Sequence, residues 1–147
     1  VLDVLWVIDN SGSMNVHQTN LSTNIGSFMS AFSSSGADYR MAVITTDRWT
    51  FSTIIDPTHP DPESALGSLV MTGIYGSGME KGIEMSYRSL SDSTAAGPGG
   101  SFYREAATLV VIYVSDEKDW STPDWSHYIT FFDSIKEKKY MKRSTVI

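Results

Sequence analysis

The stretch that decides the fold is Val-Leu-Trp-Val-Ile at residues 4–8, followed by Asp-Asn-Ser-Gly-Ser at residues 9–13. Five consecutive apolar residues with high β-propensity, ended by polar turn residues, are typical of a strand buried on both faces of a sheet. The polar loop leads into a segment whose apolar residues have the spacing of one helix face. These residues are Leu21, Ile25, Phe28, Met29 and Phe32, and Ser33–Gly36 ends the predicted helix.

Further strands are predicted downstream of this first unit. Residues 39–46 and 109–114 have the apolar, β-rich character of strands, and residues 49–55 are predicted to form a hairpin partner at the sheet edge. Residues 56–62 contain three prolines, which remove backbone donors and fix φ, so we expect an exposed loop there. Ser144–Ile147 is predicted to begin one more strand.

Two further helices are expected, because apolar residues recur every three or four positions in two more segments. The first contains Met79, Ile83, Tyr87 and Leu90, and the second begins near Asp124 and contains Tyr128, Ile129, Phe132 and Ile135. The pattern of residues 63–72 is ambiguous and leaves a short helix open. Since strands alternate with helices, the predicted fold class is α/β, with a doubly wound, mostly parallel central sheet flanked by helices.

The composition narrows the class of protein. The chain has 147 residues, with 11 basic and 17 acidic side chains and a formal net charge of −6, which fits one globular domain. The acidic balance disfavours a nucleic-acid partner, since such binders usually have a basic face. The absence of Cys excludes thiol catalysis, disulfides and Cys-ligated zinc. No apolar run approaches the roughly 18 residues of a membrane span, so direct membrane insertion is not expected.

Three polar loops are expected at one edge of this sheet, where ligands bind in doubly wound folds. Asp9-x-Ser11-x-Ser13 follows the first strand, Asp116 follows residues 109–114, and a loop containing Ser77 precedes the second helix. Together they offer two carboxylates and three hydroxyls, an all-oxygen set that suits Mg²⁺. With only two carboxylates around it, such an ion stays electrophilic and can accept a further carboxylate from outside.

The segment Val-Ile-Asp9-Asn-Ser11-Gly-Ser13-Met resembles the first signature of the von Willebrand factor A domain, with its metal-ion-dependent adhesion site. The order of elements is similar to that family over nearly the whole chain. The resemblance implies a Rossmann-like fold and a bound Mg²⁺, or Mn²⁺ or Ca²⁺, with Asp9, Ser11, Ser13 and Asp116 among its ligands. Residues 76–84, 102–106 and 114–121 are similar to a bacterial, envelope-associated subgroup.

The loop before the second helix departs from the family pattern. The family usually has a Thr there as a metal ligand, and Ser77, six residues before Ile83, stands at that position. Ser77 keeps the hydroxyl, so the resemblance implies that it is the third-loop ligand. Thr72 is the alternative for this role.

Other interpretations of these residues remain open. Asp9 and the two serines would also suit a helix N-cap. Glu117 and Asp119 are expected to be solvated loop acids, with a second cation site as the alternative. Trp120 and Trp125 are expected to anchor the last helix, although aromatic residues beside a metal also suit a recognition surface.

The resemblance implies a binding module and not an enzyme. A protein partner's Glu or Asp carboxylate, or a glycan oxygen, would complete the coordination of the cation. The subgroup implies an extracellular, cell-surface or envelope location within a larger protein. The alternatives are a structural, fibre or pilus-tip domain in which the cation only stabilises loops, and a metal-dependent hydrolase, for which no general base has a suitable spacing.

The family also implies an expectation about the extent of the domain. Its members normally continue through another strand and helix beyond a segment such as Ser144–Ile147. Residues 1–147 are therefore expected to be a single domain that lacks its last helix and part of its last strand.

Overall fold

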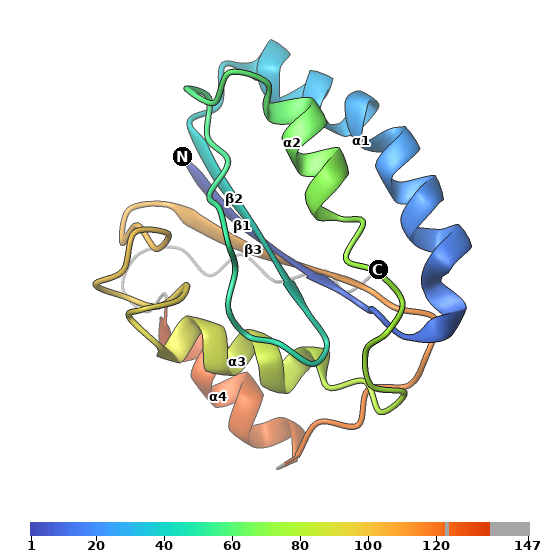
Figure 1. Ribbon diagram of the computed structural model, residues 1–147. Coiled ribbons are helices and arrows are strands. Elements are labelled where there is room, and N and C mark those ends of the chain that lie inside the picture. The colour runs from blue at the N-terminus through green and yellow to red at the C-terminus, as the bar shows by residue number, and fades with distance from the viewer. Residues whose placement is uncertain (123, 136–147) are drawn as a thin grey trace.

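The centre of the molecule is a three-stranded parallel sheet (Figure 1), in a computed structural model that describes residues 1–122 and 124–135. β1 (Leu2–Ile8) lies between β2 (Tyr39–Thr45) and β3 (Thr108–Val114), and all seven of its residues pair with both neighbours. The predicted α/β class is confirmed, and so are the three strands that the longest apolar runs indicated.

Helices cover both faces of the sheet (Figure 1). The 3-10 turn η1 (Gly12–Met14) leads into α1 (Asn15–Ser35), which lies with α2 (Pro62–Leu69) on one face. On the other face lie α3 (Gly82–Ser91) and α4 (Trp125–Ile135). The chain therefore forms three layers, with the sheet in the middle.

β1 supplies side chains to both hydrophobic cores, because alternate residues of a strand point to opposite faces. Val4, Trp6 and Ile8 pack on the side of α1 and α2, whereas Leu5 and Val7 pack on the side of α3 and α4. All five are at most 3% exposed. This burial on both faces explains why the first apolar run is continuous and does not alternate with polar residues.

The ends of two helices follow from local chemistry. α1 ends at Gly36, whose φ of 62° lies in the left-handed region that glycine adopts without strain. The predicted end of this helix is therefore confirmed. α2 begins at Pro62, and the carboxylate of Asp61 accepts a hydrogen bond from the backbone N–H of Ser64. The ambiguous residues 63–72 thus contain most of a short helix.

Two sequence predictions are corrected. Residues 49–55 do not form a strand, because only Ile55 pairs with the sheet, through a single antiparallel bridge to Met41, before the proline-rich loop begins. Met79 is 59% exposed and precedes α3, and Ile129 is 57% exposed on α4, so neither belongs to a buried helix face. The strand predicted at residues 144–147 lies outside the described residues.

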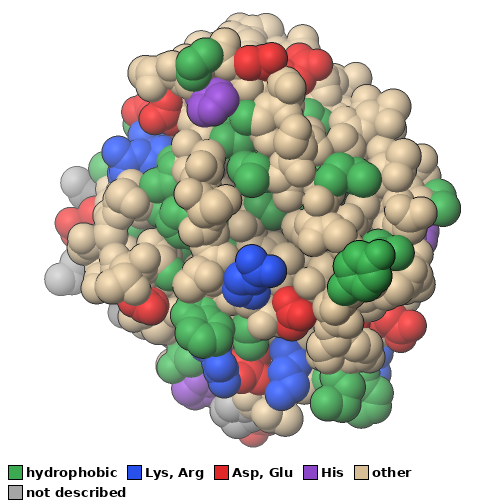
Figure 2. All heavy atoms as spheres, viewed as in Figure 1, with side chains coloured by type: hydrophobic (Ala, Val, Ile, Leu, Met, Phe, Trp, Pro, Cys, Tyr) green, Lys and Arg blue, Asp and Glu red, His purple; other side chains and the backbone are tan. Residues whose placement is uncertain are grey.

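The surface has no dominant charge on the face seen in Figure 2, where acidic and basic side chains are interspersed. On and next to α3, Glu84 forms ion pairs with both Lys81 and Arg88.

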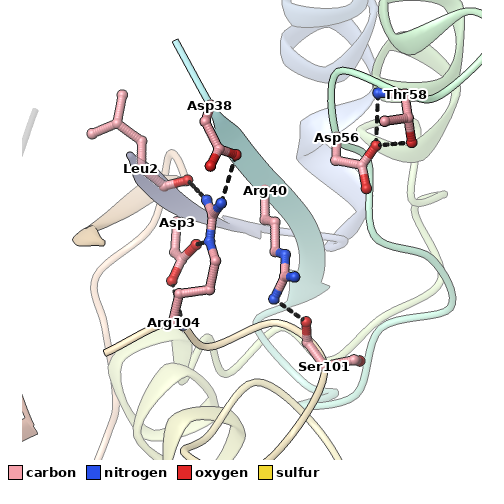
Figure 3. Close-up of polar contacts among 8 residues, drawn as sticks. All are labelled: Leu2, Asp3, Asp38, Arg40, Asp56, Thr58, Ser101 and Arg104. Atoms are coloured by element: carbon pink, nitrogen blue, oxygen red, sulfur yellow. Dashed lines mark hydrogen bonds and ion pairs between the residues drawn. The ribbon is translucent and has the colours of Figure 1, made fainter. Parts of the chain in front are cut away.

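A buried ion pair joins three segments at the amino edge of the sheet (Figure 3). The carboxylate of Asp3 is fully buried and accepts hydrogen bonds from the backbone N–H and the Nε of Arg104, at 2.7 and 2.8 Å. The same guanidinium donates to Asp38, just before β2, and to the backbone carbonyl of Leu2. Arg104 therefore neutralises the one charge that β1 carries into the sheet.

Replacing Arg104 with Ala is expected to lower the free energy of unfolding by about 3–5 kcal/mol, because it leaves the carboxylate of Asp3 buried without its partner. Urea denaturation measures this loss. Asp38→Asn is the matched control, since the Asp38 side chain is 62% exposed and exposed ion pairs contribute only about 0–1 kcal/mol. Equal losses in the two variants would contradict the assignment of the stability to buried Asp3.

Candidate metal centre

The strand order places a binding edge at the carboxyl end of β1. From β1 the chain goes first to one neighbour, β2, and later to the other, β3, so the direction of winding reverses there. Ligands bind at such a reversal point in open α/β sheets. The backbone N–H of Asp9 donates to Val114 and that of Thr46 donates to Ile8, so the loops after all three strands start side by side.

Asp9 lies at the buried, inner side of this edge. Its side chain is fully buried, and its two carboxylate oxygens accept hydrogen bonds from the backbone N–H of Ser11, at 2.8 Å, and from the hydroxyl of Ser115, at 2.6 Å. Its backbone carbonyl accepts a hydrogen bond from the side-chain amide of Gln18 in α1, at 2.8 Å. Contacts from three segments thus hold Asp9 in one orientation.

The two serines and Asp116 continue from Asp9 toward solvent. The Oγ atoms of Ser11 and Ser13 lie 3.3 Å apart, and the Ser13 hydroxyl donates to Oδ1 of Asp116 at 3.1 Å. Ser11 is buried, Ser13 is exposed and the Asp116 side chain is 29% exposed. Four of the five predicted ligands therefore form one hydrogen-bonded network that runs from a buried floor to an open rim.

The structure does not join the third predicted loop to this network directly. The hydroxyl of Ser77 accepts a hydrogen bond from the backbone N–H of Met79, at 3.0 Å, and is exposed, and its own N–H donates to Asp47. Thr72 accepts from the side-chain amide of Gln18, which also holds the carbonyl of Asp9. The choice between Ser77 and Thr72 as a ligand stays a prediction.

A second polar network at the same edge was missed by the sequence analysis. The hydroxyl of Thr46 donates to Oε2 of Glu80 and lies 3.4 Å from Oδ1 of Asn10. The amide of Asn10 donates to Asp47 at 3.1 Å. Burial opposes ionisation of Asp47, but hydrogen bonds from Thr45, Asn10 and the backbone of Ser77 outweigh it and lower the pKa of this carboxyl.

Glu80 connects the two networks. It is 1% exposed, and its carboxyl lies directly against that of Asp9. Burial raises the pKa of Glu80, the hydrogen bond from Thr46 acts in the opposite direction, and the neighbouring charge of Asp9 raises it further. Within residues 1–122 and 124–135, Oε1 of Glu80 has no hydrogen-bond partner.

The signals for these missed residues were partly present in the sequence. Asp47 follows a predicted strand directly, so it had to lie at the same edge as Asp9 and Asp116. Glu80 gave no such signal, because the apolar spacing assigned it to a helix that begins only at Gly82.

The edge is strongly acidic and has little compensating charge. Asp9, Asp47, Glu80 and Asp116 all lie there, and in the described part of the chain no Lys, Arg or His forms an ion pair with Asp9 or Glu80. His17 approaches only Asp116, with its Nε2 3.6 Å from Oδ2. Closely spaced oxygens without bases are the chemistry that hard divalent cations prefer.

The donor set would supply hydroxyls as well as carboxylates. Among the residues that the structure describes, no group of three or more His, Asp and Glu side chains is placed to hold an ion together. A cation at this edge would therefore depend on the hydroxyls of Ser11 and Ser13 beside the carboxylates. Together, these carboxylates and hydroxyls fit a divalent cation.

The neighbouring loop that carries Asp119 corrects two more expectations. Asp119 is not simply a solvated acid, because its carboxylate accepts hydrogen bonds from the backbone N–H groups of Ile83, in the first turn of α3, and of Ser121. Trp120 and Trp125 are 51% and 63% exposed, so neither anchors α4 in the core.

Comparison of the chain with protein-family models and with curated proteins finds no match. None of the helices in the described ranges has both the length and the apolar composition for crossing a bilayer.

Gly76 allows the second network to form, because a Cβ there would collide with the side-chain amide of Asn10. Gly76→Ala is expected to displace this amide from Asp47 and to lower the free energy of unfolding by about 1–3 kcal/mol. Gly78→Ala is the matched control, since nothing lies within 4 Å of its added Cβ. Chemical denaturation of both variants tests this difference, and equal stabilities would contradict it.

Proposed function

We propose that this chain is a divalent-cation-dependent adhesion or protein-recognition module with the doubly wound fold of the von Willebrand factor A type. Asp9, Ser11, Ser13 and Asp116 would hold the cation. The observation that supports this proposal is the hydrogen-bonded network of these four residues, in which the backbone N–H of Ser11 links Asp9 to the serine hydroxyls and Asp116, from two loops at the reversal point of the sheet.

Each residue has a role that follows from its position. The buried carboxylate of Asp9 supplies charge at the inner side, and the hydroxyls of Ser11 and Ser13 are neutral oxygen ligands. Asp116 supplies charge at the rim, where its side chain is 29% exposed. Ser77, or Thr72 in its place, would add the third-loop hydroxyl. Mg²⁺ suits such a set because it keeps several waters beside one or two carboxylates, and Mn²⁺ or Ca²⁺ are the alternatives.

The rim of the site supports recognition of a partner. The exposed position of Ser13 and Asp116 leaves one side of the site open to a carboxylate of a protein ligand or to a glycan oxygen. Large side chains on the adjoining loops are exposed, with Tyr75 at 97% and Trp120 at 51%, and aromatic residues commonly dominate binding energy. We propose binding and not catalysis, at a cell surface or envelope and within a larger protein.

A structural function is the second candidate. The deep burial of Asp9 and its contacts with two other segments favour a cation that holds loops together, as in a fibre or pilus-tip domain. The two candidates differ in whether a bound cation keeps a coordination position for a partner.

Calorimetric titration with MgCl₂ and MnCl₂ tests the cation site. We expect the unsubstituted chain to bind one ion, and Asp9→Asn and Asp116→Asn each to weaken binding by about 10–100-fold or more. Glu117→Gln is the matched control, because Glu117 is an exposed acid in the same loop as Asp116 and should leave the affinity unchanged. Absence of binding to the unsubstituted chain would overturn the proposed function.

The relaxation rate of solvent water protons in the presence of Mn²⁺ separates recognition from a purely structural function. A recognition site predicts at least one rapidly exchanging water on the bound ion and displacement of that water by acetate, used here as the simplest carboxylate probe. A bound ion with no exchanging water, or with water that acetate does not displace, would favour the structural domain.

A further inference from the structure

The backbone on both sides of the Glu80 side chain is held by the other two loops of the edge. The carbonyl of Glu80 accepts a hydrogen bond from the backbone N–H of Trp120, at 2.6 Å, in the loop after β3. The next N–H, that of Lys81, donates to the carbonyl of Thr46, at 3.2 Å, directly after β2. These two backbone hydrogen bonds therefore fix the position of Glu80 at the edge without involving its carboxyl.

The carboxyl of Glu80 lacks the partners that a buried carboxylate needs. Oε2 accepts a hydrogen bond from Thr46, while Oε1 is buried and has no partner among the described residues. The adjacent base, Lys81, is directed away and forms an ion pair with Glu84. The group that Glu80 does meet is the carboxyl of Asp9, whose two oxygens already accept other hydrogen bonds.

Two buried carboxyl groups in contact cannot both be ionised without a counter-charge between or beside them. A Lys or Arg does not fill this role for either group within the described ranges. For the part of the chain that the structure describes, this leaves a shared proton or a bound cation. The cation is favoured because Glu80, with its unpartnered Oε1, interacts with Asp9, and Asp9 is followed in the same loop by the hydroxyls of Ser11 and Ser13, which lie 3.3 Å apart.

We propose that Glu80 is a ligand of the same divalent cation, which it shares with Asp9 from the opposite side. This inference rests on the proposed function, because it adds a residue to that site. Asp9 and Glu80 would then bind the ion directly from the buried side, and Asp116 would contribute its charge through water at the rim, so that with a divalent ion bound the net charge of the centre would be −1 and not zero. Such a centre retains its cation when no partner is present.

Glu80→Gln tests the proposal, because it removes the charge with almost no change in shape. With Mn²⁺ alone as the probe, calorimetry is expected to give binding that is about 10–100-fold weaker than for the unsubstituted chain. Without metal, thermal denaturation is expected to give a higher Tm for the variant, because it no longer buries a second acid beside Asp9. With saturating Mn²⁺ this advantage should shrink or reverse.

Glu84→Gln is the matched control. Glu84 is also largely buried, at 8% exposure, but its carboxylate is compensated by ion pairs with Lys81 and Arg88. This variant is expected to lose stability with and without metal and to keep its Mn²⁺ affinity. Glu80→Asp, which keeps the charge and shortens the reach, is expected to bind Mn²⁺ with an affinity between those of the unsubstituted chain and Glu80→Gln, and it provides a second measurement if Glu80→Gln does not fold.

The outcomes distinguish this inference from the function on which it rests. If the unsubstituted chain binds Mn²⁺ and Asp116→Asn weakens that binding while Glu80→Gln and Glu80→Asp leave it unchanged, Glu80 is not a ligand and the proposed function stands. If the unsubstituted chain does not bind Mn²⁺, both proposals fail. A higher metal-free Tm for Glu80→Gln with unchanged Mn²⁺ affinity would identify Glu80 as a carboxyl that shares a proton with Asp9.

Discussion

The parallel pairing of β1 with a strand on each side is the constraint on which the rest of the structure depends. Parallel neighbours need long crossover connections, and these place helices on both faces of the sheet. They also place the carboxyl ends of all three strands at one edge, where the loops that begin at Asp9, Thr46 and Ser115 meet. The carboxyls of Asp9 and Glu80 are buried at this edge, so each needs a partner, and each accepts a hydrogen bond from a loop that is distant in sequence.

The two ends of β1 meet this need in different ways. At the amino end, the buried carboxylate of Asp3 is neutralised by Arg104, with hydrogen bonds to two of its nitrogens. At the carboxyl end, Asp9 is equally buried but lies against another carboxyl, that of Glu80, and has no basic partner among the described residues. Because burial of an uncompensated charge is costly, only the first arrangement is complete within residues 1–122 and 124–135. The second is the arrangement expected where something from outside the chain binds.

The parts that sequence reasoning predicted are those in which one signal is strong and local. The continuous apolar runs predicted β1, β2 and β3, and Gly36 predicted the end of α1. Asp9, Ser11 and Ser13 share one loop, and Asp116 follows a strand that had to end at the same edge. Residues 49–55 were predicted wrongly as a strand because their β-propensity was not supported by pairing beyond Ile55. Glu80 could not be predicted, since its position depends on backbone contacts with Thr46 and Trp120, each more than 30 residues away.

The number of carboxylates at the centre determines which partner chemistry it favours. With Asp9 and Asp116 alone, a divalent ion is just neutralised and its open side attracts an external carboxylate, as the sequence suggested. With Glu80 added, the ion would be held more firmly, but its attraction for an anionic partner would be reduced. Neutral oxygen donors, such as glycan hydroxyls or backbone carbonyls, then compete better with a carboxylate for the open position. As a ligand, Glu80 would therefore strengthen retention of the cation and weaken affinity for an acidic partner, so this one residue would influence the selectivity of the surface around the site.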